Sequence, residues 1–171
     1  MSVVTYTEAG LAKLISAKNE GLKGAITHIA AGSAKYTPSV KQTKLKDEKQ
    51  RVEIVDYEEL GPTTLRLAAR FDGDLEYEVG EVGFYLDDET LLAVFSAPDT
   101  TLTYKAPGTH WIERFTLDLT PLPSDSVTIE VGVEDVNLMM TEEFATMATS
   151  LITQHTLFMG LLFRVGELEK Q

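Results

Sequence analysis

The 171-residue sequence contains no cysteine, so disulfide bonds and thiolate chemistry are excluded. Long apolar runs are missing as well. The longest such stretch, 157–165, is interrupted by Gly160 and Arg164 and is far shorter than the ~20 residues that a membrane-spanning helix needs. Two large classes, disulfide scaffolds and membrane-spanning helical proteins, are therefore not indicated.

Histidine is scarce, and catalytic motifs are missing. His28, His110 and His155 stand far apart without the HExxH spacing of zinc proteases, and we expect His28 and His155 to be structural. The sequence has no GxSxG motif, no phosphate-binding P-loop and no GxGxxG fingerprint. It therefore predicts a protein that is not an enzyme and that carries no cofactor.

Two acidic segments, 72–76 and 87–89, are candidates for cation sites. In "FDGDLEYE" a calcium loop would require glycine where Tyr77 stands and glutamate where Gly83 stands. We interpret the first segment as a solvated acidic turn and the second as a polar hairpin tip. No metal site is predicted.

Charge is distributed unevenly along the chain. The net charge of −12 argues against a general nucleic-acid binder. Residues 1–51 hold nine basic and four acidic residues (+5), whereas residues 52–171 hold six and twenty-three (−17). The basic excess lies mainly in Lys35, Lys41, Lys44, Lys46, Lys49 and Arg51. Two interpretations stay open: this stretch faces the acidic remainder of its own fold, or it docks on an acidic partner.

The first fifty residues predict a helix, a strand and a loop. Thr7 is a good helix cap, and Glu8 suits the first turn. Apolar residues at helical spacing follow, and Gly21 or Gly24 can end the helix; these residues are Leu11, Leu14, Ile15 and Leu22. Residues 25–32 read as a buried strand, and the polar, lysine-rich residues 33–50 read as a loop.

From residue 51 to residue 133 the apolar period is two. The alternating runs are separated by the turn signals "GPTT", "FDGD", "LDDET", "APGT" and "PLPSD". Trp111 is predicted to be a buried strand aromatic, while Gly80 and Gly83 inside a strand indicate a bulge or a close backbone approach. The predicted fold class is α+β, a mostly antiparallel sheet or sandwich with an N-terminal helix packed on it.

After Thr141 the period becomes helical again, and we divide the chain into a domain at 1–136 and an oligomerisation helix at 137–171. The a and d positions of one heptad frame are Phe144, Met147, Leu151, Gln154, Phe158, Leu161, Val165 and Leu168. Further apolar residues, Ile152, Leu157, Met159 and Leu162, lie off this seam. The helix either bundles copies of the chain or packs on its own domain.

The segment "GEVGFYLDDETLLAVFSAP", residues 80–98, resembles the signature of the N-terminal domain of phage tail-collar fibre proteins, E-V-G-L-(apolar)-D-x-x-G-x-L-(apolar)-A-V. The matching residues are Glu81, Val82, Gly83, Phe84, Tyr85, Leu86, Asp87, Leu91, Leu92, Ala93 and Val94. "TEAGLAKL", "ITHIAAGSAKYTP" and "TKLKDEKQRVEI" resemble other parts of that family in the same order, so the resemblance covers roughly residues 5–133. Glu89-Thr90 replaces the Asp-Gly that the family often has at the hairpin, which weakens the expected tight turn.

This resemblance implies a non-enzymatic structural protein of the virion tail, made in the host cytoplasm, that joins fibres to the baseplate of a contractile phage tail as a homotrimer. Its implied partners are a baseplate protein and another fibre or receptor-binding protein. The residues that we expect to dock on the baseplate are Lys41, Lys44, Lys46 and Lys49. The residues that we expect to contact the partner fibre are the off-seam residues Ile152, Leu157, Met159 and Leu162.

The polar ending at Gln171 favours a short adaptor over a fragment of a longer fibre. The runner-up is a module that binds a host surface or carbohydrate, and a glycan-cleaving enzyme ranks third.

Overall fold

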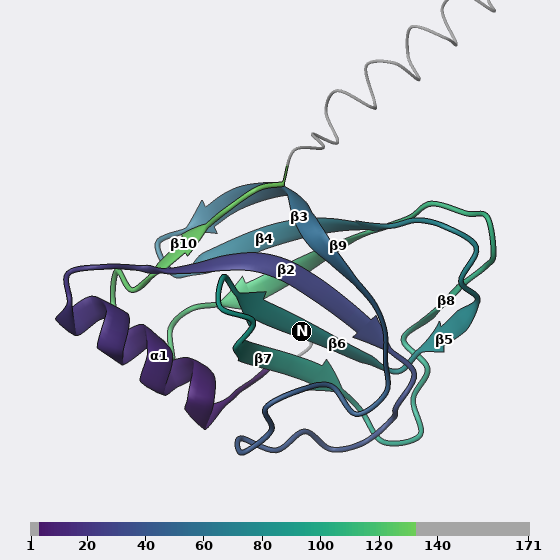
Figure 1. Cartoon of the computed structure of the whole chain (residues 1–171), viewed down its shortest axis with the longest axis horizontal. Coiled ribbons are helices and arrows are strands. Elements are labelled where there is room, and N and C mark those ends of the chain that lie inside the picture. Colours follow the sequence, from purple (N-terminus) through teal and green to yellow (C-terminus); the bar gives the residue numbers. More distant parts are fainter. Residues whose placement is uncertain (1–3, 133–171) are drawn as a thin grey trace, which may run out of the picture. The chain divides into compact units, whose positions relative to one another are not determined.

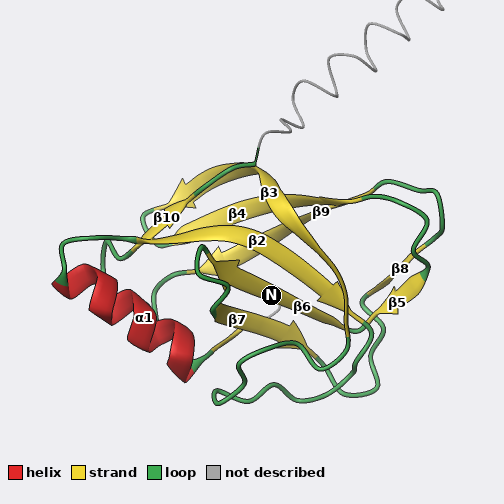
Figure 2. Cartoon of the chain, in the orientation of Figure 1, coloured by secondary structure: helices red, strands yellow, loops and turns green. Residues whose placement is uncertain are grey.

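The computed structural model describes residues 4–132. The predicted helix 137–171, with its heptad seam and its off-seam apolar residues, lies outside this range. Within it, no helix is long and apolar enough to cross a membrane. The described residues form a curled β-sheet with one helix beside it (Figures 1 and 2).

The helix α1, Glu8–Asn19, begins where the sequence predicts. The side chain of Thr7 accepts a hydrogen bond from the Gly10 N–H at 3.0 Å and donates one to the carbonyl of Leu91 at 2.5 Å. The Thr7 side chain therefore satisfies one of the free backbone N–H groups at the start of the helix, and it also ties the helix to the sheet. Gly21 follows the helix with a φ of 75°, a left-handed conformation that suits glycine.

The main sheet has the strand order β1-β7-β6-β2-β3-β4-β9, and β10 pairs with β2. The strands are β1 (Thr5–Tyr6), β2 (Gly24–Gly32), β3 (Glu48–Gly61), β4 (Thr64–Phe71), β6 (Glu81–Leu86), β7 (Leu91–Ser96), β9 (Trp111–Asp118) and β10 (Val127–Ile129). A separate two-stranded ribbon is formed by β5 (Tyr77–Val79) and β8 (Thr103–Lys105). The pairs are antiparallel except β10 with β2, so the predicted mostly antiparallel sheet is confirmed.

The long strand β3 makes the sheet curl. Its first half pairs with β2, and its second half, after a register shift between Ile54 and Asp56, pairs with β4. The two halves of the sheet face each other. Phe84 on β6 therefore contacts Phe115 on β9 edge-to-face, with ring centroids 5.7 Å apart. The Tyr6 hydroxyl donates to the carbonyl of Asp118, which links the first and last strands of the order at 2.5 Å.

The core lies between these two halves. The alternating residues Leu65, Leu67, Ala69 and Phe71 of β4 are buried, as predicted. Val82, Phe84 and Leu86 share one face in the main core, as predicted, although β6 is buried on its other face as well. Burying one such leucine or phenylalanine contributes about 1.5–3 kcal/mol. Leu14 is the fully buried residue of α1 and belongs to the same cluster.

Three local predictions were wrong or incomplete. Leu22 was placed on the apolar face of the helix, yet it lies beyond the helix end and is 60% exposed. The loop was predicted to reach residue 50, yet β3 begins at Glu48, because the strand continues beyond its apolar residues. Trp111 is only half-buried and stacks on Phe71 with ring centroids 4.5 Å apart.

Candidate functional site

No cluster of three or more histidine or acidic side chains in residues 4–132 is arranged to hold a metal ion. The Nδ1 atom of His28 lies 2.8 Å from the Thr27 hydroxyl on a half-buried strand. His110 is exposed and its Nδ1 lies 2.5 Å from Asp72. These contacts hold backbone segments in place and do not assemble a nucleophile with a base.

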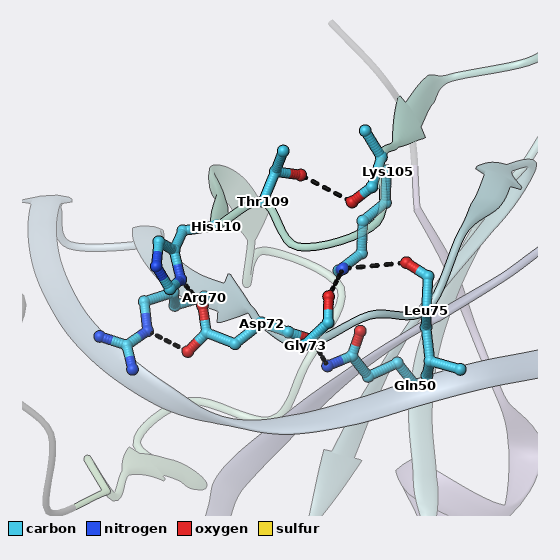
Figure 3. A network of polar contacts seen from close by, with 9 residues as sticks. Gln50, Arg70, Asp72, Gly73, Leu75, Lys105, Thr109 and His110 are labelled. Atoms are coloured by element: carbon cyan, nitrogen blue, oxygen red, sulfur yellow. Dashed lines mark hydrogen bonds and ion pairs between the residues drawn. The ribbon is translucent and has the colours of Figure 1, made fainter.

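The acidic turn 72–76 closes around a lysine (Figure 3). The ammonium of Lys105, a fully buried side chain, donates to the carbonyls of Gly73 at 2.8 Å and Leu75 at 3.0 Å. Gln50 donates to the Asp72 carbonyl at 2.8 Å, and the Asp72 carboxylate pairs with Arg70 and His110. The cation that organises this turn is thus a lysine ammonium of the chain itself.

The most heavily braced surface element is the segment 33–47, named here the basic loop. It is held by Glu81, whose side chain is completely buried although it is a carboxylate. The Tyr36 hydroxyl and the Lys46 N–H donate to one Glu81 oxygen at 2.7 and 2.9 Å, and the Asp47 N–H donates to the other at 2.6 Å. Charge-assisted bonds of this kind are short and strong, and they offset the cost of burying the charge.

A second contact layer fixes the end of the basic loop over the outer face of β6. Leu45 packs with Tyr85, Leu91 and Val94, a cluster separate from the main core. Gly83 makes room for it, because a Cβ there would lie 2.9 Å from Leu45 Cδ2. The glycine inside the signature strand therefore serves a close approach, one of the two alternatives that the sequence left open.

The start of the basic loop is also fixed by backbone contacts. The Tyr36 N–H donates to the Ser96 hydroxyl at 3.1 Å, and that hydroxyl donates to the Gly80 carbonyl at 2.8 Å. A Cβ on Gly80 would lie 2.6 Å from the Ala34 carbonyl oxygen, so the chain crosses this glycine directly. Near the tip, the carbonyl of Val40 accepts a hydrogen bond from the Glu8 N–H at 2.7 Å.

Two tyrosines of this network keep their protons at neutral pH. Burial, together with the hydrogen bond to Glu81, raises the pKa of Tyr36 above its ordinary value. Burial is also the main cause that raises the pKa of Tyr85 to about 12. Tyr85 accepts from the Leu45 N–H at 3.3 Å and donates to Glu48 at 3.1 Å, a role that requires the neutral hydroxyl.

The four predicted docking lysines are all exposed on or next to this braced loop. Lys46 lies over the ring of Tyr36 at 3.9 Å, and Lys49 pairs with Asp47 at 2.9 Å. Lys41 and Lys44 form no ion pair with any of residues 4–132. The interpretation that this stretch faces its own acidic fold fits Lys35, which pairs with Glu78 at 2.7 Å, but not Lys41 or Lys44.

Sequence reasoning did not find Glu81 or Lys105. Glu81 is one of the signature residues but has no role assigned from the sequence, and Lys105 belongs to none of the motifs. A glutamate at the start of a strongly apolar strand is a usable signal for Glu81, since a buried carboxylate needs hydrogen-bond donors. For Lys105 no comparable signal existed, because its carbonyl partners come from a turn thirty residues earlier.

The described residues define a class: a β-domain whose polar interactions fix its surface loops. The family model described as phage tail-collar fibre protein, N-terminal, matches residues 1–111, and the chain belongs to this family. The match ends before residue 133, to which the resemblance was expected to extend. A comparison with curated proteins finds no match. Membership makes the chain a structural protein of the phage tail fibre.

Proposed function

We propose that the chain is a non-enzymatic connector that joins tail fibres to the baseplate of a phage or phage-like contractile particle. The observation that supports this best is the basic loop, whose conformation is fixed by Glu81 while its Lys41, Lys44 and Lys46 are exposed. A loop that is ordered before it binds loses less entropy on binding. Such a loop suits a permanent joint in a particle.

The lysines of this loop are the proposed contact to the baseplate. Lys41 and Lys44 are exposed and unpaired among the described residues, and Lys46 and Lys49 lie beside them. An acidic baseplate surface would complement them and would speed encounter through long-range attraction. The heptad residues of 137–171 are proposed to bundle three copies, and their off-seam apolar neighbours are proposed to take the fibre partner.

Particle attachment tests this function. Tail particles assembled without the chain are incubated with the purified wild type or with a variant carrying Lys41→Glu, Lys44→Glu, Lys46→Glu and Lys49→Glu. The wild type should bind in a salt-sensitive manner, and the reversed variant should bind about tenfold or more weakly. A control reverses three exposed charges elsewhere, at Lys13, Lys18 and Lys23, and leaves the outward arginines of β4 and β9 unchanged. Equal binding by the reversed variant and the wild type would remove the loop from the joint.

A further inference from the structure

The two-stranded ribbon of β5 and β8 carries an exposed surface that the proposed joint does not use. Its strands pair Glu78 with Tyr104 and Tyr77 with Lys105. Tyr77 and Lys105 point inward and are buried, whereas Leu75 and Tyr104 are each 51% exposed. We name this surface the acidic ribbon, and its exposed members are Asp74, Leu75, Glu76, Glu78 and Tyr104.

The acidic ribbon is rigidly supported from beneath. The Lys105 ammonium and Gln50 fix the carbonyls of the turn that leads into it (Figure 3). The Tyr77 hydroxyl donates to Gln50 at 3.2 Å. Above this base, the Tyr104 hydroxyl donates to Glu76. The two hydrogen bonds to the carbonyls of Gly73 and Leu75 offset the cost of burying the Lys105 ammonium. They also hold the turn in one conformation.

A surface of opposite character lies on the outward side of β4 and β9. The register places Arg66 beside Thr116, Ala68 beside Arg114 and Arg70 beside Ile112, and we name these six residues the arginine face. Together with Asp56, Tyr57 and Glu58 of β3, part of this face forms a shallow hollow of about 90 Å³, with the buried Ala68 among its lining residues. The hollow is much smaller than the pockets that hold small molecules, so it suits part of a single side chain.

Two charges of the arginine face, those of Arg114 and Arg66, are available to a partner, whereas Arg70 pairs with Asp72. Arg114 is exposed and forms no ion pair with any of residues 4–132, and Arg66 pairs at 3.1 Å with a Glu58 that is itself mostly exposed. Exposed pairs of this kind are weak and can be exchanged for a new partner. Ile112, 46% exposed, adds apolar area to the same strand face.

We propose that the acidic ribbon of one copy of the chain docks on the arginine face of a neighbouring copy. Guanidinium groups bind carboxylates and stack on aromatic rings, so Arg66 and Arg114 fit Glu76 and Tyr104 in both respects. The two surfaces differ from each other, so the contact is heterologous and repeats from copy to copy around a ring. It is separate from the basic loop, which stays free for the baseplate.

The absence of cysteine permits a direct cross-linking test on the full chain. One chain carries Leu75→Cys on the ribbon and a second carries Thr116→Cys on the arginine face, and neither change removes a charge. On mild oxidation of the mixture, the mixed disulfide between the two chains should form, because a disulfide requires the two Cα atoms to approach within about 7 Å. The control mixture pairs Leu75→Cys with Ser16→Cys, an exposed neutral position on α1.

Charge exchange then tests specificity. Asp74→Arg with Glu76→Arg leaves the Glu78–Lys35 pair intact and should lower the mixed-disulfide yield about tenfold, as should Arg66→Glu with Arg114→Glu. A cysteine pair in which every chain carries both exchanges should recover the yield. Tyr104→Ser, which alters no charge, should lower it as well. Circular dichroism of each variant checks that the sheet is retained.

Three results would overturn the contact: a yield no higher than in the Ser16 control, an unchanged yield after either exchange, or no recovery when both are combined. Performing the experiment between 1 and 100 µM separates it from the proposed helix-mediated trimer. If light scattering shows a monomer at the lower concentrations, that trimer is wrong, and cross-linking at the higher concentrations still decides whether the two surfaces meet.

Discussion

The chain fixes two surface segments with buried charges of opposite sign, and the comparison between them is instructive. The basic loop is held by a buried carboxylate, Glu81, which accepts from one hydroxyl and two backbone N–H groups. The turn 72–76 is held by a buried ammonium, Lys105, which donates to two backbone carbonyls. In both cases the surface charge of the segment is opposite to the charge beneath it.

The two anchors differ in what their loss leaves behind. Removing Glu81 orphans three donors and leaves a cavity beneath the loop, because the Glu81 side chain is completely buried. Removing Lys105 orphans two carbonyls, and a carbonyl beside exposed residues such as Gly73 and Leu75 can turn to water. The comparison therefore predicts that the carboxylate anchor contributes more to stability than the ammonium anchor.

The largest expected effect follows from Glu81→Ala. A cavity forms and the three donors lose a charged acceptor, so the free energy of unfolding should fall by about 3–5 kcal/mol. Chemical denaturation of the full chain measures this. Glu81→Gln keeps the shape but places an amide N–H₂ among donors, so it should rescue only part of the loss. A change below about 1 kcal/mol for Glu81→Ala would break the comparison.

Lys105→Met should cost less, about 1–3 kcal/mol, because the methionine fills the same space and the two carbonyls can be hydrated. Denaturation under the same conditions gives the value. The exposed Lys44→Met serves as the matched control and should change stability by less than about 0.5 kcal/mol. A loss larger than that of Glu81→Ala would reverse the order of the two anchors.

Alkaline pH should weaken both regions through their tyrosines. Burial raises the pKa of Tyr85, at the basic loop, and of Tyr77, beneath the ribbon, to about 12. The folded chain therefore favours the protonated phenols, while the unfolded chain releases these protons near pH 10. Stability should be constant with respect to these groups below pH 10 and fall between pH 10 and 12.

Tyr85→Phe and Tyr77→Phe assign this alkaline loss to the two regions. Each variant should be less stable at neutral pH by about 1–2 kcal/mol, because Tyr77 loses one hydrogen bond and Tyr85 loses two. Each should also show a shallower decrease in stability above pH 10. Thermal unfolding at several pH values follows both effects. If the double variant shows the same alkaline slope as the wild type, these tyrosines are not the cause.

The smallest expected effect concerns the hairpin between β6 and β7, which neither anchor touches. Glu89 has a φ of 64°, a left-handed conformation that is unfavourable for a residue with a Cβ. The tight turn forms nevertheless, with the Glu89 N–H donating to the Leu86 carbonyl at 3.0 Å. Glu89→Gly should raise the free energy of unfolding by about 0.5–1 kcal/mol. A decrease would show that the Glu89 side chain contributes more than its backbone costs.

Elements with local signals were predictable from the sequence. The helix after Thr7 and the alternating strands from Leu65 and from Val82 follow from caps and apolar periods, which act over a few residues. The interactions that position the surfaces act over long distances. Glu81 accepts from donors more than thirty residues away, and Lys105 donates to a turn about thirty residues earlier. The residues next to Glu81 and Lys105 in the sequence therefore do not indicate these partners.

The glycines of the signature show how a local sequence signal and a long-range contact can coincide. Gly83 and Gly80 indicated a bulge or a close approach, but the sequence could not say what approaches. In the structure, Leu45 approaches Gly83 and the Ala34 backbone approaches Gly80, and both belong to the basic loop. The signature segment around β6 therefore supports the basic loop: its Gly80, Glu81 and Gly83 each contact that loop or leave space for it. This gives a structural role to a segment that has no catalytic group.

Amide hydrogen exchange at Lys46 and Asp47 tests the central claim most directly, that the buried Glu81 holds the basic loop in one conformation. Both N–H groups donate to the Glu81 carboxylate. In the wild-type full chain they should exchange at rates close to those of the β6 core amides, and in Glu81→Gln at least about tenfold faster, with the β4 amides unchanged. Exchange of Lys46 and Asp47 at the rates of an unprotected loop in the wild type would contradict the account.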